Sequence, residues 1–570
     1  MIKTNILKPL TISLLFIILV LTHFSGTITG DEEKVYNFVD SYLRNNISFF
    51  EWLKNPLDDC EIWLKCHSTF FKHNFAWFLI NGLIIKFTQS ILFFYNDFLN
   101  NTFLVELVLS FFNSMCFFLS FFVLYKNFYK KFGSHITIAT IILFIYGTYI
   151  NNFVAGGYIE CIIMLILSFR ICYLGKENLT KFDIIIISFL DALLISLRFF
   201  YFWVILIFFI IHLITLTNKK NIKFFYTYYL LVPLIFLFSF YYLQNSIPTK
   251  AYLNTNELKD IGFLDYYLIK ITRSFCVNDI ISIVSILFQR IYLSFFSFSV
   301  GLFFIFPLII LTLTYYKERV YLLKILILFG FIGAYSLEQN FYLPAGISGH
   351  RGIAPILLIF FPEILNSISR LSKSNKNKII SVFLSLLIIV FSSSIFYRST
   401  LGHYTVFTKL AVNADEKILN SKDISTRNDA NVLTTQKEVP LCYKQDTFNH
   451  GAIDLHSGIF GWKFLFLNIT NANEASISSK LGKRIMSLKD FTPQTLIHKV
   501  NYLIQYDFYN YEDNPLKAVF TNNNYLLKLS KFIYFLSTFL ILIIPTILFN
   551  YLFFLQKNTF PILKKDRHQL

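Results

Sequence analysis

The feature that most restricts how this chain can fold is a series of long apolar runs that recur along most of its 570 residues. A membrane-spanning helix needs about 20 consecutive, largely apolar residues to cross roughly 30 Å of hydrocarbon. Hydrophobic residues make up 55% of the chain and charged residues only 15%, against about 25% charged in ordinary soluble domains. A soluble fold could not bury so much apolar surface. The sequence therefore predicts a polytopic α-helical membrane protein.

The apolar runs alternate with short basic connections, and this alternation predicts about twelve transmembrane helices. Every second connection is short and rich in Lys and Arg, as the positive-inside rule requires when both termini are cytoplasmic. The predicted spans are residues 10–23, 103–125, 135–153, 158–174, two runs that flank Arg198, 225–243, 291–316, 320–336, 352–368, 379–396 and 532–555. The long connections, residues 30–101, 244–290 and 398–525, then lie on the external face.

These segments divide the chain into a transmembrane core (1–397, with a first external loop at 30–101), an external domain (398–525), and a last span with a cytoplasmic tail (526–570). The external domain has turn formers and short apolar runs, which predict a small α/β or α+β fold. In the first loop, residues 75–94 predict an amphipathic helix along the outer membrane surface. The first span reads either as a retained helix or as a cleaved signal peptide.

The formal net charge of +17 does not indicate nucleic-acid binding, because Lys and Arg concentrate in the short connections, where they set membrane orientation. The sequence has no separate basic domain with interleaved aromatic residues. We therefore expect membrane lipids, and no nucleic acid, among the partners.

Four of the seven cysteines lie in predicted external segments: Cys60, Cys66, Cys276 and Cys442. An even number there suits an oxidising compartment, so they either form two disulfides in one of three pairings or remain free thiols. The sequence has no Cys-x-x-Cys or His-x-x-x-His spacing, and it predicts no metal site and no cofactor.

Acidic residues stand at the external ends of two predicted spans. Asp31 and Glu32 follow directly after the first span, where a carboxylate can act as a general base on a hydroxyl. Glu160 stands just inside the fourth span, where a carboxylate is costly and usually faces a cavity or a partner. The alternatives are that the first cluster is simply solvated and that Glu160 extends to the membrane surface.

Two arginines lie on the same predicted face. Arg351, next to His350 and between two glycines, begins the tenth span, where its guanidinium fork suits an anionic head group. Its alternative role is that of an interfacial anchor. Arg198 is external and isolated between the fifth and sixth spans, and either joins the same site or has no role in it.

The order of these clusters resembles that in the GT-C membrane glycosyltransferases, which use polyprenyl-phosphate sugars and include protein O-mannosyltransferases and aminoarabinose transferases. Gly30-Asp31-Glu32 with a following aromatic residue resembles the Gly-Asp-Glu motif of that superfamily. Tyr158-Ile159-Glu160 resembles its second acidic motif, with Ile in place of Pro. The run from Gly349 to Pro355 resembles Gly-x-Arg-x-Leu-x-Pro, with Ile in place of Leu. The resemblance covers the first ten spans and leaves out residues 398–525.

The resemblance implies a GT-C-like fold and inverting transfer of a hexose or pentose from a polyprenyl-phosphate donor to a hydroxyl of a glycan, lipid or protein. Asp31, or else Glu32, would be the general base, and Glu160 would position the acceptor or assist the base. Arg351, with His350 and Arg198, would bind the donor phosphate. The site would face the periplasm from a bacterial inner membrane or the lumen from an endoplasmic reticulum membrane. Metal dependence varies among the members of the superfamily.

Two other functions fit a chain of this kind. An O-antigen polymerase or ligase also has about twelve spans and a large external loop, and would depend on His450, His456 and Lys463 rather than Asp31. A transporter or lipid flippase would have broken helices, charged pairs at mid-membrane and pseudo-symmetric halves. The sequence shows no such symmetry, and we expect few charges within the spans.

Overall fold

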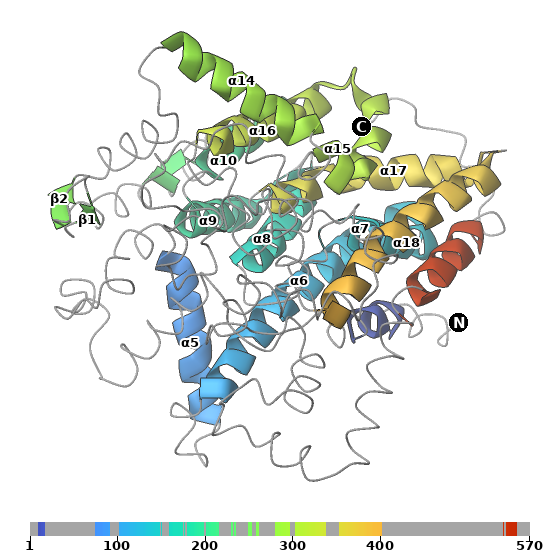
Figure 1. The fold of residues 1–570 in the computed structure, drawn as a ribbon, viewed down its shortest axis with the longest axis horizontal. Coiled ribbons are helices and arrows are strands. Elements are labelled where there is room, and N and C mark those ends of the chain that lie inside the picture. The colour runs from blue at the N-terminus through green and yellow to red at the C-terminus, as the bar shows by residue number, and fades with distance from the viewer. Residues whose placement is uncertain are drawn as a thin grey trace, which may run out of the picture.

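A computed structural model describes part of the chain, and this part is mostly helical (Figure 1). The described residues are 10–17, 75–91, 102–148, 150, 159–174, 176, 179–198, 201–215, 230–231, 233–234, 249–252, 258–261, 280–296, 302–337, 353–374, 376–401, 540 and 543–555. The main α-helices are α5 (Phe75–Ile91), α6 (Thr102–Phe132), α7 (Ser134–Tyr146), α8 (Ile159–Leu174), α9 (Lys181–Leu197), α10 (Tyr201–Thr215), α14 (Ile280–Phe296), α15 (Leu302–Ile305), α16 (Arg319–Ser336), α17 (Phe361–Ser372) and α18 (Asn377–Leu401). The described helical part also contains two 3₁₀-helices, η5 (Pro307–Tyr315) and η7 (Ala354–Phe360), a first helical segment at residues 10–17, and a helix at Ile543–Leu555.

In the described part of the chain, two helical segments are long and apolar enough to cross a membrane, Val108–Phe132 and Ala354–Ser372. Shorter apolar helices cover Ser134–Tyr146, Tyr201–Thr215, Asn377–Ser392 and Ile543–Leu555. The prediction of a mostly helical protein with candidate membrane spans is confirmed. The full count of spans and their orientation stay predictions.

The core lies around α7, α8 and η7, because most residues of these elements are apolar and buried. Almost every residue of α7 is buried, as expected for a helix without a polar face. Helix α6 and the 3₁₀-helix η7 both pack against α8. The ring of Phe144 lies 5.2 Å from that of Phe306 and 5.3 Å from that of Phe361, so aromatic contacts join α7 to the later helices.

The outer helices expose large apolar side chains to their surroundings. Phe189 on α9, Phe288 on α14 and Ile379 on α18 are all more than half exposed. Helix α14 lies at the outer edge of the bundle beside α16 (Figure 1). Extended apolar surface on a soluble monomer is rare and marks an interaction with protein or lipid, so this pattern favours a lipid environment.

The predicted eighth span, residues 291–316, is not one continuous helix in the structure. Helix α14 starts earlier than the predicted span, at Ile280, and ends at Phe296. Helix α15 ends at Ile305. Pro307 then begins η5, because proline lacks an N–H and its ring prevents an α-helix from continuing through it. The third span is also shorter than predicted, since α7 ends at Tyr146, before Gly147.

Helix α5 packs within the bundle through one face. Trp77 and Ile85 are buried, and the Asn81 amide oxygen accepts a 3.1 Å hydrogen bond from Asn113 on α6. The helix also contacts α9. The helix predicted in this segment is therefore confirmed, whereas its position along the outer membrane surface stays a prediction.

A two-stranded antiparallel hairpin, β1 (Thr249–Tyr252) and β2 (Leu258–Ile261), lies in the predicted second external connection. In its register Lys250 stands opposite Asp260.

Both ends of the described chain lie against the bundle. The Tyr146 hydroxyl donates a 2.9 Å hydrogen bond to the carbonyl of Leu15 in the first helical segment. Near the other end, Asn550 hydrogen-bonds Ser381 and donates to Ser385 over 2.8 Å, so the last helix packs along α18 (Figure 1). The predicted external domain, apart from the last turn of α18, lies outside the described residues.

Candidate functional site

The structure describes two of the six predicted site residues, and it brings these two together. The Arg198 Nη2 atom lies 2.5 Å from the Glu160 Oε1 atom in an ion pair. Glu160 is fully buried, and the Arg198 side chain is 19% exposed. The other four, Asp31, Glu32, His350 and Arg351, lie outside the described residues, as do the cysteines predicted to be external.

Each partner of this pair stands at a helix end. Glu160 is the second residue of α8, where a carboxylate is favoured by the partial positive charge of the helix N-terminus. Arg198 ends α9 in an extended conformation and donates its N–H to the Leu194 carbonyl. Its own carbonyl accepts a 3.1 Å bond from the Tyr201 N–H, which begins α10. Arg198 therefore forms the turn between α9 and α10.

A second ion pair joins the same two helices deeper in the bundle. The Arg170 Nε atom lies 2.8 Å from the Asp191 Oδ1 atom, and both side chains are fully buried. The Arg170 Nη1 atom lies 2.6 Å from His212 Nε2 on α10, and the guanidinium sits 4.9 Å from the centre of the Phe208 ring. We call Arg170, Asp191 and His212 the buried charge cluster.

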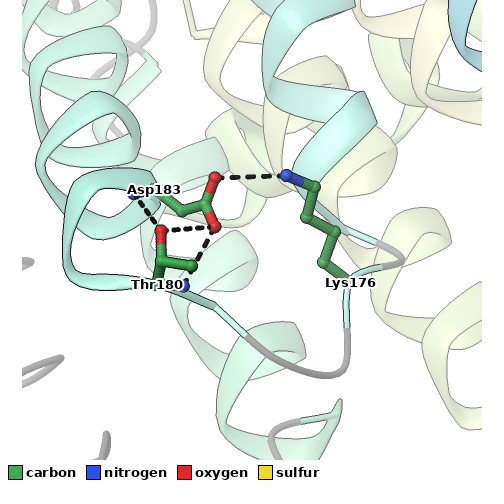
Figure 2. A network of polar contacts seen from close by, with 3 residues as sticks. All are labelled: Lys176, Thr180 and Asp183. Atoms are coloured by element: carbon green, nitrogen blue, oxygen red, sulfur yellow. Dashed lines mark hydrogen bonds and ion pairs between the residues drawn. The ribbon is translucent and has the colours of Figure 1, made fainter.

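A third ion pair closes the polar end of the α8–α9 hairpin (Figure 2). The Lys176 Nζ atom lies 3.1 Å from Asp183 Oδ1. The N–H and hydroxyl of Thr180 each donate to Asp183 Oδ2 over 2.9 Å, and the Asp183 N–H returns a 3.1 Å bond to the Thr180 hydroxyl. This capping box satisfies donors at the helix start and fixes where α9 begins.

The three ion pairs form an ordered series along two antiparallel helices. From the turn outward they are Lys176–Asp183, Arg170–Asp191 and Arg198–Glu160, and each joins α8 or its extension to α9 or its end. We call this series the ion-pair ladder. The outer two pairs have opposite polarity, because α8 supplies the cation in one and the anion in the other. Sliding either helix by one turn would separate both pairs, so the ladder fixes the register that brings Glu160 to Arg198.

A further buried ion pair lies between α16 and α17, where Lys324 pairs with Glu363. Glu318 precedes α16 in the connection after η5. Partial burial and the Glu363 carboxylate raise the pKa of Glu318 above its ordinary value, despite the opposite effect of Arg370 and Lys324.

Charged side chains within predicted spans pair with one another in the described part of the chain. Arg170 and Asp191 lie inside predicted spans, as do Lys324 and Glu363, and sequence reasoning missed the buried charge cluster. The signal was present: Arg170, Asp191 and His212 each interrupt an apolar run, and ionisable groups within membrane helices are costly and usually paired.

The arrangement can hold a carboxylate in one orientation at the end of a helical bundle, with its charge balanced by a guanidinium. Such a group can accept a hydrogen bond from a hydroxyl and orient it. Among the described residues no cluster of three His, Cys, Asp or Glu side chains is placed to bind a metal ion. The chain matches no protein-family model, no curated protein and no solved structure.

Proposed function

We propose that the protein is a membrane glycosyltransferase that transfers a sugar from a polyprenyl-phosphate donor to an acceptor hydroxyl at the external face. The Glu160–Arg198 ion pair carries this proposal. The sequence predicts both residues as members of one site, and they lie in contact although 38 positions separate them. A buried carboxylate with a fixed partner suits a group that must hold a substrate hydroxyl.

The position of the pair relative to the basic residues supports an external site. Lys176 and Lys181 mark one end of the α8–α9 hairpin, where the positive-inside rule predicts the cytoplasm. Helix α8 has 16 residues, which corresponds to about 24 Å at 1.5 Å per residue. Glu160 is at the far end of this helix, so it would lie at the opposite side of a hydrocarbon layer.

The packing of η7 supports including the arginine motif, the run from Gly349 to Pro355, in the proposed site. The 3₁₀-helix begins at Ala354, three residues after Arg351, and packs against α8. The element that follows the arginine motif is thus a direct neighbour of the helix that starts beside Glu160. This neighbourhood supports a site in which Arg351 and Glu160 act on one substrate complex.

In the proposed reaction the acceptor oxygen attacks the anomeric carbon of the sugar, and the bond from that carbon to the phosphate oxygen breaks. Asp31, or else Glu32, takes the hydroxyl proton, a role suited to a carboxylate within hydrogen-bond reach. Glu160 orients the acceptor, and Arg351 with His350 stabilises the departing lipid phosphate. Because Arg198 pairs with Glu160, we assign it first to holding that carboxylate, and its contact with the donor phosphate stays a prediction.

The proposal retains the architecture expected from the sequence. It comprises about twelve spans with both termini cytoplasmic, and the domain at 398–525 lies over the site and contributes to acceptor choice. In this proposal, the domain at 398–525 determines whether the acceptor is a glycan, a lipid or a protein.

The direct test is transfer of radiolabelled sugar from polyprenyl phosphate in membranes that contain single variants at equal protein levels. Asp31→Asn keeps the shape of the side chain but cannot accept the proton, so we expect a loss of about 10²–10⁴-fold. Glu160→Gln should also lower transfer, whereas Glu33→Gln, the adjacent matched control, should cost much less. Arg351→Lys should be damaging because an ammonium cannot make bidentate phosphate contacts. Near-parental transfer by Asp31→Asn would overturn the proposal.

The second candidate is a transporter or flippase, and the buried charges favour it. Arg170–Asp191 and Lys324–Glu363 are charged pairs within predicted spans, and the helices are interrupted at Pro307. Such features occur in secondary transporters. Purified protein in vesicles with a fluorescent polyprenyl-phosphate lipid in both leaflets would show exchange between leaflets. Exchange that is abolished by Arg170→Gln, without sugar transfer by the parent protein, would select this function.

Variants of His450, His456 and Lys463 would distinguish an O-antigen polymerase or ligase from both the glycosyltransferase and the transporter. These three residues lie outside the described part of the chain. Loss of activity in these variants, with normal activity in Asp31→Asn, would indicate that class.

A further inference from the structure

Arg170, in the middle of the ladder, contacts two other helices. Its guanidinium meets Asp191 on α9 through Nε and His212 on α10 through Nη1. It also lies over the face of Phe208 on α10, a cation–π contact. One side chain of α8 therefore holds both α9 and α10.

Helices α9 and α10 are the two arms of a hairpin, and its tip is the second point of contact with α8. The turn between the arms contains Arg198, which pairs with Glu160 at the start of α8. Glu160 and Arg170 are ten residues apart, about 15 Å along the helix at 1.5 Å per residue. The α9–α10 hairpin is thus fixed to α8 at two positions. Arg170 holds both arms, and Glu160 holds the tip through Arg198.

We propose that Arg170 is a positioning residue that, by holding both arms of the α9–α10 hairpin, places Arg198 against Glu160. An arginine suits this role because its planar fork offers donors in several directions at once, whereas a lysine ammonium is a point charge. For sugar transfer, this role rests on the proposed function, since it acts through Glu160.

The hydrogen-bond donors and acceptors of the buried charge cluster allow one protonation arrangement, so the cluster holds the three helices in a fixed position. Arginine can only donate hydrogen bonds, so His212 accepts at Nε2 and carries its ring proton on Nδ1. A second proton on this ring would place one cation against another in a buried site, which is strongly unfavourable. The cluster therefore holds one positive charge and one negative charge, and they balance.

The test measures the environment of Glu160 without any sugar transfer, so it stands apart from the test of the proposed function. Dicyclohexylcarbodiimide is an apolar reagent that modifies protonated carboxyl groups, and the modified peptide is quantified by mass spectrometry. A carboxylate that has lost its cation in an apolar site is favoured in its protonated form. The variant Arg198→Gln is the reference, because it gives the extent of Glu160 labelling when the partner arginine is absent.

We expect Arg170→Gln to raise labelling at two places: at Asp191, which loses its partner, and at Glu160, whose partner is displaced. The expected rise at Glu160 is about tenfold, equivalent to 1.4 kcal/mol. The matched control is Lys324→Gln, which removes the cation of the pair with Glu363. It should raise labelling at Glu363 and leave Glu160 unchanged. Labelling that rises at Asp191 but stays at the parental level at Glu160 in Arg170→Gln would overturn the proposal.

A second variant keeps the proposal testable if Arg170→Gln does not accumulate. His212→Leu removes the hydrogen bond between Arg170 and the α10 arm, and it leaves the Arg170–Asp191 pair and the Phe208 contact in place. We expect increased labelling at Glu160 with Asp191 still protected, and His212→Gln, whose amide oxygen can accept the same hydrogen bond, should restore protection. Parental labelling of Glu160 in His212→Leu would show that the hydrogen bond from Arg170 to His212 does not position Arg198, and would overturn the role of that bond in the two-arm hold.

Discussion

Gly330 on α16 is a position where one added methyl group should separate two packed helices. A Cβ built there would lie 1.9 Å from Nε1, 2.5 Å from Cε2 and 2.6 Å from Cδ1 of Trp203 on α10. The Trp203 Nε1 also donates a 3.3 Å hydrogen bond to the Leu326 carbonyl on α16. Gly333, one turn further along the same helix, has nothing within 4 Å of such a Cβ.

The magnitude follows from these distances. Carbon contacts are favourable at about 3.5–4.0 Å, so the indole must move by roughly 1.6 Å or more in Gly330→Ala. Overpacking of this kind costs about 1–3 kcal/mol, and loss of the indole hydrogen bond about 0.5–1.5 kcal/mol. Alanine recovers about 1 kcal/mol of helix propensity. We expect Gly330→Ala to destabilise the protein by about 0.5–3.5 kcal/mol. We expect Gly333→Ala to be neutral or to stabilise it by up to about 1 kcal/mol.

The assay is the fraction of monodisperse protein that remains after heating in detergent, measured for both variants side by side. Trp203→Ala combined with Gly330→Ala should melt no lower than Trp203→Ala alone, because the obstructing ring is gone. Equal midpoints for Gly330→Ala and Gly333→Ala would refute the close packing of α10 on α16. A full penalty for Gly330→Ala in the Trp203→Ala background would assign the cost to another cause.

Three further predictions address other parts of the molecule. Thr180→Ala should lower stability by about 0.5–2 kcal/mol through loss of the helix cap, while Thr180→Ser should retain it, as thermal unfolding will show. The raised pKa of Glu318 has a defined sign: its ionisation opposes folding, so the associated stability is present at acid pH and lost as pH rises through the folded pKa. Glu318→Gln should therefore raise the melting midpoint at neutral pH and not at acid pH. Cysteines near Asn254 should react with an impermeant reagent from outside, and those near Lys376 should not. Outside labelling near Lys376 would contradict the predicted topology.

The sequence predicted the position of most described helices, because apolar runs bounded by charged or small residues are a strong signal. Helix α16, Arg319–Ser336, differs by one residue from the predicted span, and α8 likewise. The interruption at Pro307 was missed, since a single proline hardly changes the apolarity of a long run. Partners of the buried charges were also missed. The sequence places Arg170 within a predicted span, but the direction it faces depends on the rotation of α8, which only packing determines.

The candidate site was predictable only in part, because the contacts between its residues depend on how the helices pack. Glu160 and Arg198 were each selected as site residues, yet their contact depends on the register of α8 against α9. That register comes from charge pairs distributed over the whole hairpin rather than from any local motif. The other predicted site residues, Asp31 and Arg351 among them, lie outside the described part of the chain.

Under the predicted topology, in which α8 and α9 both span the membrane, the ion-pair ladder has a consequence for how the chain would enter a bilayer during synthesis. An Arg or Asp at the centre of an isolated membrane helix costs about 2.5–3.5 kcal/mol to insert. Helix α8 alone would take Arg170 into lipid without a counterion, and α9 alone would take Asp191. The connection between Leu174 and Lys181 is short, so the two helices can meet before either leaves the insertion machinery. We therefore expect α8 and α9 to enter the membrane as a pair, with their charges already neutralised.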